Sequence, residues 1–286
     1  MTDASLIVVA IIWALNFSVV KITLQQIDPF SFNTLRYILA SALLVVVAKK
    51  KGFSLKVKKE HFWKLVGIGI VGNLVYQLLF IIGLDYTYSA NAAVMLGTIP
   101  IWVALLSQLF TEEKLTLAKS IGIFLAFIGV SLILIGGKNG ISFASDTFKG
   151  DLIMLLSAVS WAVYTILSKK YLRFYNSTQY SAFMSVIGAI SLLIVGAPFL
   201  IKLDVSSITL TGYGGIIYSG LLSVGFAYLI WNNGISKLGA VRTASYQNLV
   251  PVLGLIFGVL ILDEPLTLFQ YIGSGFVILG IILTRR

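Results

Sequence analysis

The sequence predicts an all-α integral membrane protein whose ten transmembrane helices form two inverted five-helix repeats. Composition is the first reason: of 286 residues, 58% are hydrophobic and only 11% are charged, whereas about a quarter of the residues in a soluble domain are charged. The second reason is that residues 86–111, 174–201 and 205–236 contain no charged side chain. A helix needs about 20 mostly apolar residues to cross a bilayer, so these runs are long enough.

The third reason is a pattern of residues that occurs twice. The first copy spans residues 83–129, and the second begins 151 positions later. Each copy has a proline inside an apolar run, an acidic pair at the end of that run, and glycines seven residues apart in the next run. The matching landmarks are Gly83 and Gly234, Ala93 and Ala244, Pro100 and Pro251, Glu112-Glu113 and Asp263-Glu264, Gly122 and Gly273, and Gly129 and Gly280. We therefore expect two related halves, residues 1–137 and 151–286, joined by a linker at 138–150.

Ten apolar segments can be drawn along the chain. The predicted spans are residues 5–23, 30–48, 63–84, 90–111, 117–137, 151–168, 178–200, 211–233, 242–262 and 267–284. Cytoplasmic loops carry an excess of Lys and Arg, and the connection between the second and third spans carries the largest such excess, namely Lys49, Lys50, Lys51, Lys56, Lys58 and Lys59. Both termini should therefore face the cytoplasm, in the cell (inner or plasma) membrane. Because each half has an odd number of spans, the two halves would enter the membrane from opposite sides.

Several short motifs follow one another in a fixed order. They are Trp13-Ala14-Leu15-Asn16-Phe17, Pro100 followed by Glu112-Glu113, Trp161-Ala162, and Pro251 followed by Asp263-Glu264-Pro265. With these motifs the whole chain resembles the drug/metabolite transporter superfamily and, within it, the bacterial EamA-type family. The resemblance implies ten helices around a central cavity, lined mainly by helices one to four and six to nine. It also implies carriage of amino acids, nucleosides, drugs or similar metabolites, often as export.

Polar and aromatic side chains within the spans are candidates for contacting a substrate, because polar groups in a bilayer either join helices or face a watery path. Trp13, Asn16 and Phe17 share one face of the first span, as Trp161 and Tyr164 do in the sixth. The alternative for Asn16 and the tryptophans is helix packing or an interfacial position. The full set of expected cavity residues is Trp13, Asn16, Phe17, Arg36, Asn73, Tyr76, Gln77, Met95, Thr98, Trp161, Tyr164, Tyr228, Trp231, Ser245, Tyr246, Gln247 and Asn248.

Two prolines are expected to interrupt their helices. Pro100 and Pro251 deprive the carbonyls of Leu96 and Gln247 of their helical partners, and such breaks at membrane depth are tolerated where the backbone lines a cavity. Each proline would then act as a hinge or gate beside the site. The alternative is that each only bends its helix for packing. Because the ninth span is much more polar than the fourth, we expect the second copy to contribute more to substrate contact.

Arg36 is the one charged residue well inside a predicted span. An intramembrane charge is a functional candidate by default, so Arg36 could pair with a substrate carboxylate or an aromatic face. It could instead extend toward the outer headgroups. The acidic residues all lie at span ends or in loops. His61 lies beside Glu60 in the basic loop, where we expect it to be solvated.

Composition also argues against several kinds of function. The chain has no cysteine and one histidine, and no paired acids at membrane depth that could support acid–base or metal chemistry. We therefore predict no catalytic residue, no metal and no cofactor, and a protein that is not an enzyme. The net charge of +10 lies in short loops, which argues against a nucleic-acid partner. The expected partners are a small-molecule substrate and the lipid bilayer.

Inverted repeats are typical of secondary transporters that work by alternating access. We therefore predict a secondary transporter. The alternative is a channel, but a pore more typically shows charged rings or a filter sequence. The glycines spaced by seven in the fifth and tenth spans permit close helix approach. They predict either a packing seam within one chain or the contact of a homodimer.

Overall fold

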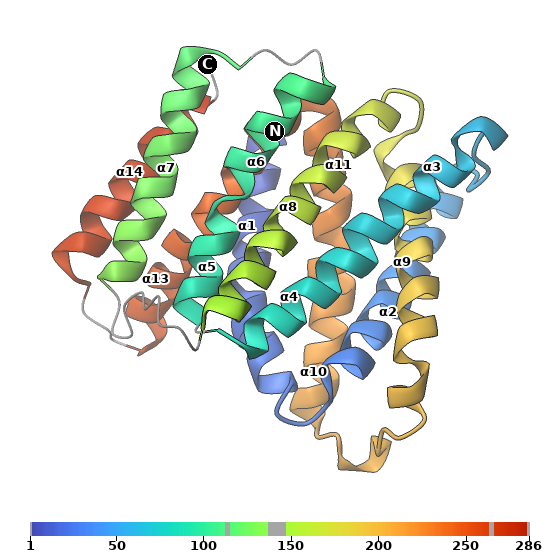
Figure 1. Cartoon of the computed structure of the whole chain (residues 1–286). Coiled ribbons are helices and arrows are strands. Elements are labelled where there is room, and N and C mark those ends of the chain that lie inside the picture. The colour runs from blue at the N-terminus through green and yellow to red at the C-terminus, as the bar shows by residue number, and fades with distance from the viewer. Residues whose placement is uncertain (1, 88, 112–114, 137–146, 263–265, 285–286) are drawn as a thin grey trace. The chain divides into compact units, whose positions relative to one another are not determined.

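The computed structural model describes residues 2–87, 89–111, 115–136, 147–262 and 266–284 (Figure 1). In these ranges the regular secondary structure is helical, with no strand. Seven of the described helices are long and apolar enough to cross a membrane, and two shorter apolar helices accompany them. That all ten predicted segments cross the bilayer stays a prediction. Both acidic pairs of the repeated pattern, Glu112-Glu113 and Asp263-Glu264, lie outside the described residues, as does most of the predicted linker.

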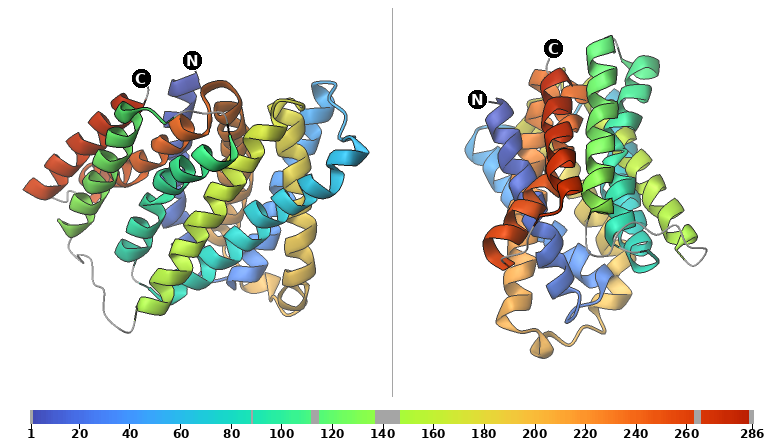
Figure 2. Two further views of the ribbon diagram at one scale, coloured as in Figure 1. Left: turned by 45° about the horizontal axis from the view of Figure 1, so that its top comes forward. Right: turned by 90° about the vertical axis from the view of Figure 1, so that its left-hand side faces the viewer.

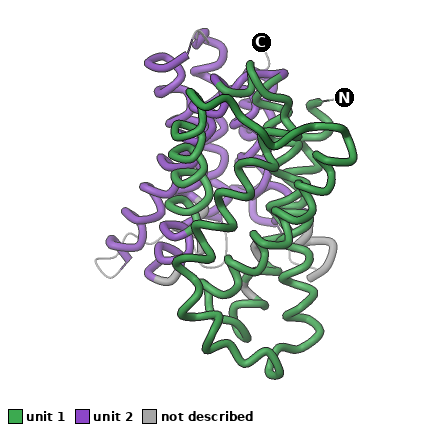
Figure 3. Tube along the Cα trace, turned by 90° about the vertical axis from the view of Figure 1, so that its right-hand side faces the viewer, with its two compact units in different colours: residues 1–77, 171–236 green, residues 78–170, 237–286 purple. Residues whose placement is uncertain are grey.

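The chain forms two compact units, and each of them draws on both halves of the sequence (Figure 3). Unit 1 comprises Met1–Gln77 and Tyr171–Ser236, and unit 2 comprises Leu78–Lys170 and Lys237–Arg286. Helices from one half therefore pack mainly against helices of the other half within the same unit.

Unit 1 contains five long helical segments, two of which include a π-helical stretch, and one short 3-10 helix. Its elements are α1 (Thr2–Thr23), α2 (Pro29–Lys50), α3 (Lys59–Gly69), η1 (π, Ile70–Val75), the start of α4 (Tyr76–Asp85), α9 (Ser177–Leu200), η2 (3-10, Val205–Ser207), α10 (Leu210–Ile217), η3 (π, Tyr218–Phe226) and α11 (Ala227–Leu238). The sequence specifies the start of α2 well. Asp28 accepts hydrogen bonds from the amides of Phe30 and Ser31, and Pro29 occupies the first turn, where its missing N–H costs nothing.

In unit 1, α2 packs along α9 and η3, while α1 packs on α10 and η3 (Figure 2). The contact between α2 and α9 depends on two small residues. A Cβ at Gly188 would lie 2.7 Å from the ring of Tyr37, and one at Gly196 would clash with the hydroxyl of Thr34. Thr34 uses that hydroxyl to reach across the helix pair, with its Oγ1 3.1 Å from the carbonyl oxygen of Leu192.

Unit 2 contains the remainder of α4 and the helices that carry the two prolines. Its other elements are α5 (Ser89–Gly97), α6 (Ile99–Phe110), α7 (Leu117–Ile135), α8 (Phe148–Tyr171), α12 (Ala240–Ser245), η4 (3-10, Tyr246–Asn248), α13 (Leu249–Leu262) and α14 (Leu268–Thr284). The unit includes α8 as far as Lys170. The green α7 and the red α14 lie side by side in Figures 1 and 2.

The glycines spaced by seven form the contact between α7 and α14. A Cβ at Gly122 would lie 2.6 Å from the carbonyl oxygen of Gly280, and one at Gly129 would lie 2.5 Å from that of Gly273. Small residues are what allow two membrane helices to approach this closely. The glycines therefore form a seam within one chain. A homodimer through these two helices stays a prediction and would need their other faces.

The expectation that His61 is solvated is wrong. Its side chain is only 13% exposed, and its Nδ1 lies 2.8 Å from the hydroxyl of Tyr175. The rings of Tyr171 and Phe174 also contact the imidazole, with centroids 5.3 and 5.0 Å away. The basic loop is thus anchored to the segment before α9, and the backbone amide of Lys58 donates to the same Tyr175 hydroxyl. The sequence could not show this, because the aromatic residues lie more than a hundred positions away.

Candidate functional site

Arg36 lies at the centre of a buried polar network in unit 1. Its side chain is 4% exposed. Nη2 donates to Oε1 of Gln77 at 2.5 Å, Nη1 donates to Oγ of Ser219 at 3.1 Å, and the guanidinium lies 5.0 Å from the centroid of the Phe32 ring. The guanidinium thus lies against an aromatic face, one of the two functional alternatives predicted for it. These contacts hold the side chain among the helices, and the alternative that it extends toward the outer headgroups stays a prediction.

The network continues from Gln77 to two tyrosines and an asparagine. The Gln77 amide nitrogen donates to the hydroxyls of Tyr37 at 3.2 Å and Tyr228 at 3.3 Å. Tyr37 in turn donates to Oδ1 of Asn73 at 3.2 Å, and Asn73 donates to the backbone carbonyl oxygens of Gly69 and Met184. All four of these polar residues are buried. Buried polar groups are costly without partners, so this network ties its helices together.

Local backbone geometry brings these side chains together. Asn73 lies in η1 and Ser219 in η3, the two π-helical stretches of unit 1. Single π turns inside α-helices occur frequently at functional sites. A glycine also lets η3 approach the backbone of α2 at Arg36, since a Cβ at Gly220 would lie 2.8 Å from the backbone oxygen of Arg36. The π-helical η3 and α2 can therefore pack with their backbones close together around Arg36.

An aromatic group from α1 and α11 adjoins this network. Trp13 donates its indole N–H to the backbone oxygen of Ser223 in η3. Its ring lies 6.3 Å from that of Tyr228, edge to face, and 5.2 Å from that of Trp231. Trp13 is partly exposed, whereas Trp231 is buried. Aromatic contacts of this kind contribute about 1 kcal/mol beyond burial.

Asn16 and Phe17 of α1 and Tyr76 of α4 are further predicted residues of unit 1. Asn16 is partly exposed, and its Oδ1 is a buried acceptor without a hydrogen-bond partner among the described residues. The side chain of Phe17 lies outside the described part of the structure. Tyr76 is partly exposed and lies close enough to Arg36 to interact with it electrostatically.

No carboxylate of unit 1 balances the charge of Arg36. The acids of this unit are Asp3, Asp28, Glu60 and Asp204. Asp28 and Asp204 cap helices, Glu60 lies near Lys58 and His61, and Asp3 belongs to the first turn of α1. Taking an ion out of water without a counter-charge costs several kcal/mol. The neutral dipoles and the ring described above are therefore all that stabilises this cation within the described unit.

The predicted residues of unit 2 gather where helices are interrupted. Thr98 separates α5 from α6 two residues before Pro100, and its hydroxyl lies 2.5 Å from the carbonyl oxygen of Met95. In the second copy the 3-10 segment Tyr246–Asn248 precedes Pro251. An interruption therefore accompanies each proline, as the missing N–H requires; the role of hinge or gate stays a prediction.

The polar stretch before Pro251 is mostly buried. Ser245 accepts a hydrogen bond from Thr284 of α14 at 2.9 Å, so that it serves packing. Tyr246 and Asn248 are also buried. Both amide atoms of Asn248 and Oε1 of Gln247 have no hydrogen-bond partner among the described residues. Buried amides without partners are rare in proteins, which marks these two side chains as candidates for a substrate contact.

The remaining predicted pair, Trp161 and Tyr164, lies on α8. Both side chains are buried, and their rings stack with centroids 5.1 Å apart. The helical spacing of three residues does place them together, as expected. Their role in binding stays a prediction.

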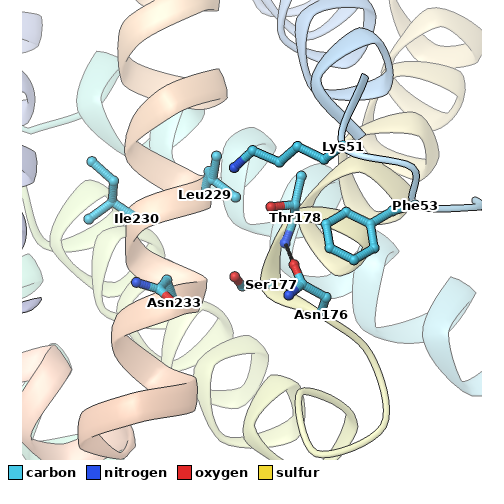
Figure 4. Close-up of a pocket in the computed structure, with 8 residues that line it drawn as sticks. All are labelled: Lys51, Phe53, Asn176, Ser177, Thr178, Leu229, Ile230 and Asn233. Atoms are coloured by element: carbon cyan, nitrogen blue, oxygen red, sulfur yellow. Dashed lines mark hydrogen bonds between the residues drawn. The ribbon is translucent and has the colours of Figure 1, made fainter. Parts of the chain in front are cut away.

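A pocket of about 400 Å³ opens in unit 1 where α2 ends and α9 begins (Figure 4). Its lining residues are Lys51, Phe53, Asn176, Ser177, Thr178, Leu229, Ile230 and Asn233. Asn176 uses Oδ1 to accept the backbone N–H of Thr178 at 2.9 Å, the dashed contact in Figure 4. None of the pocket residues takes part in the Arg36 network, so the two features are separate.

Sequence reasoning missed several members of the network. Tyr37, Ser219 and Phe32 were not among the expected cavity residues. A tyrosine directly after an intramembrane arginine was a usable signal. Ser219, by contrast, is 183 positions away from Arg36, and a lone serine in an apolar run carries no signal. Asn232, outside this network, is fully buried and donates to Ser181 of α9 at 2.8 Å, a contact between residues too far apart in the sequence for spacing to indicate it.

Comparison with known proteins identifies the family. The sequence profile of the EamA-like transporter family matches residues 1–135 and 148–286. The chain belongs to this family. An uncharacterized transporter of Bacillus subtilis, YyaM, is 30% identical over 268 residues, covering 93% of this chain and 88% of the relative. An uncharacterized transporter of Archaeoglobus fulgidus is 32% identical over 276 residues, covering 96% of this chain and 95% of the relative.

A solved structure shares the fold. One protein of known crystal structure is similar with a TM-score of 0.84 and 18% sequence identity, covering 99% of this chain and 94% of that chain. The family and the apolar helices together make this a multi-pass membrane protein of a transporter family. They point to transport, not to catalysis. Among the described residues, His, Cys, Asp and Glu do not gather in groups of three that could hold a metal ion.

Proposed function

We propose that this protein is a secondary transporter that moves a small metabolite across the membrane by alternating access. The observation that carries the proposal is the buried network around Arg36, which joins segments from both sequence halves through polar side chains. A buried charge inside a membrane helix is costly and marks a substrate or ion path. Family membership and transporter relatives support the same function.

The proposed substrate contacts come from both units, considered separately. In unit 1 they are Arg36, Gln77, Asn73, Tyr76, Tyr228, Trp13, Trp231, Asn16 and Phe17. In unit 2 they are Gln247, Asn248, Tyr246, Ser245, Met95, Thr98, Trp161 and Tyr164. The interruptions at Pro100 and Pro251 would serve as hinges, because an interrupted helix can bend without breaking regular hydrogen bonds.

The inverted-repeat arrangement is part of the proposal. Its support is the reciprocal contact of α7 with α14, the matching helices of the two sequence halves. Gly122 meets Gly280 and Gly129 meets Gly273, so the helices run antiparallel. Gly122 corresponds to Gly273, and Gly129 to Gly280, so each contact maps onto the other when the halves are exchanged. A two-fold axis produces this kind of self-complementary contact.

Counterflow in proteoliposomes tests the proposed mechanism. Vesicles with purified protein would be preloaded with unlabelled amino acids, nucleosides or organic acids in turn, and uptake of the labelled solute measured. A carrier should show accelerated uptake when preloaded, whereas a channel should show none. Absence of counterflow with every solute of the panel, from correctly folded protein, would contradict the proposal.

Two variants and a topology assay complete the test. Asn16→Ala and Trp161→Ala should lower transport without loss of folded protein, with the exposed Lys202→Gln as a control. Full activity in both variants would remove these two residues from the proposed site.

The topology of the chain can be tested with reporter fusions. They should place both termini and the loop at residues 51–58 in the cytoplasm. Export is the proposed direction of transport. A carboxy terminus outside the cell would contradict the inverted repeat.

A further inference from the structure

We infer that Arg36 binds the carboxylate of a small organic anion, so that the transported solute is a carboxylate with an apolar or aromatic body. The inference rests on the proposed transport function and adds the substrate class. Its starting point is that Arg36 is a buried cation for which unit 1 provides neutral partners only.

The hydrogen bonds of Arg36 leave part of its donor set unused. Among the described residues it donates only to Gln77 and Ser219, and its Nε is buried without a hydrogen-bond partner. A guanidinium carries more N–H donors than these two acceptors use, and all of them point outward in one plane. Nε together with a terminal nitrogen is the arrangement that binds a carboxylate through two parallel hydrogen bonds.

The charge balance points to an anion. All acids of unit 1 lie at helix ends or in loops, as described above, and none forms an ion pair with Arg36 among the described residues. A purely structural role would be met at lower cost by a neutral side chain, because neutral dipoles offset the desolvation of a buried ion less fully than a counter-charge does. A bound carboxylate would supply that counter-charge while present and withdraw it on release.

The surroundings favour an apolar body over an inorganic anion. Phe32 covers one side of the guanidinium, and the phenol groups of Tyr37, Tyr76 and Tyr228 lie near it. Tyr228 also contacts Trp13. Of these, Tyr76 and Trp13 are partly exposed. A site with one charged group and several aromatic walls suits a solute with one charge and one hydrophobic end.

A matched pair of ligands gives the decisive experiment. The purified full chain in detergent would be heated with 3-phenylpropionate or with 3-phenylpropionamide, which has the same body without the charge. The carboxylate at millimolar concentration should raise the Tm by a few degrees, since a ligand that binds the folded state stabilises it. The amide should leave the Tm unchanged. An equal shift from the amide would overturn the inference, and this comparison needs no variant.

Variants then locate the binding site. Arg36→Gln should abolish the shift caused by the carboxylate, and Arg36→Lys should weaken its binding about tenfold, because an ammonium cannot bind a carboxylate through a planar fork. Lys202→Gln, which removes an exposed cation of the same unit, should keep the full shift. A full shift in Arg36→Gln would overturn the assignment. A shift of the same size from nitrate or inorganic phosphate would overturn the choice of an organic solute.

Counterflow with the same pair separates this inference from the proposed function. Counterflow with neutral or cationic solutes, and none with any carboxylate, would leave a transporter and overturn its proposed substrate class. Absence of counterflow with all solutes, together with a Tm shift specific to carboxylates, would instead contradict transport while Arg36 remained an anion-binding residue.

Discussion

Units 1 and 2 each bring matching helices of the two sequence halves together, but they do so by different means. In unit 1, α2 and α9 meet through side chains: Thr34 reaches the backbone of α9, and the ring of Tyr37 fills the space beside Gly188. In unit 2, α7 and α14 meet through their backbones at the four seam glycines. The first kind of contact can rearrange by rotating side chains, whereas the second cannot.

This difference indicates how the two units divide their roles. A backbone contact has no rotamer to change, so the α7–α14 seam should act as a rigid support. A network of hydroxyl, amide and guanidinium groups can exchange its partners at modest cost, because each net hydrogen bond contributes only about 1 kcal/mol. On this argument we propose unit 1 as the better place for a site that must bind and release a solute. The expectation that the second copy of the repeated pattern, which includes Gln247 and Asn248 of unit 2, contributes more to substrate contact stays a prediction.

The largest effect should come from the seam. Gly273→Ala places a methyl group 2.5 Å from the backbone oxygen of Gly129, and only a shift of a whole helix can relieve that clash. We expect a loss of stability of about 3 kcal/mol, or no folded protein. The control lies two residues away: a Cβ at Gly275 meets nothing within 4 Å, so Gly275→Ala should keep the wild-type Tm. Equal thermal unfolding of the two variants would refute the rigid seam.

A smaller effect is expected from overpacking the helix pair of unit 1. Gly188→Ala brings a methyl group within 2.7 Å of the Tyr37 ring and 2.8 Å of the Asn73 Cβ. Since side chains can turn aside, we expect a cost of about 2 kcal/mol, with ligand stabilisation through Arg36 reduced as well. Gly214→Ala is the control, because its Cβ would meet nothing within 4 Å. A Tm shift as large as that of Gly273→Ala would remove the distinction between the units.

Removing single hydroxyls should sharpen the comparison further. Tyr37→Phe deprives both Gln77 and Asn73 of a partner and should cost about 2 kcal/mol, whereas Thr284→Val removes one bond to Ser245 and should cost about 1 kcal/mol. Thermal unfolding ranks the two variants. The reverse order would mean that unit 2 depends on side-chain hydrogen bonds more than unit 1 does.

The smallest effect concerns pH and a loop of unit 1. Hydrogen bonds from the side chain and backbone of Ser206 hold the pKa of Asp204 below its ordinary value. A lowered pKa means that the charged cap stabilises the fold above the unfolded-state pKa and that this contribution is lost as pH falls through the folded-state pKa. Asp204→Asn should therefore flatten slightly the acid side of a Tm–pH profile. A profile identical to that of the wild type would show that the cap contributes nothing measurable.

Local sequence signals predicted much of the helical structure. The apolar segment drawn at 30–48 located α2, which runs from Pro29 to Lys50, and the glycines spaced by seven marked the seam between α7 and α14. The prolines at 100 and 251 indicated where the helices are interrupted. These features depend on residues within one or two helical turns, which is the range over which spacing is informative. The partners of Arg36, the burial of His61 and the bond between Asn232 and Ser181 depend on residues far apart in the chain.

By itself, the sequence determined that this protein is helical and apolar, that it carries a repeated pattern, and that one arginine lies inside an apolar helix. Composition and periodicity suffice for this, because a bilayer demands helices whose backbone groups are satisfied within the segment. Only the tertiary structure decided what Arg36 contacts. The cost of burying its charge depends on the groups that surround it in space, and those groups come from α2, the start of α4 and η3, which meet only in the folded chain.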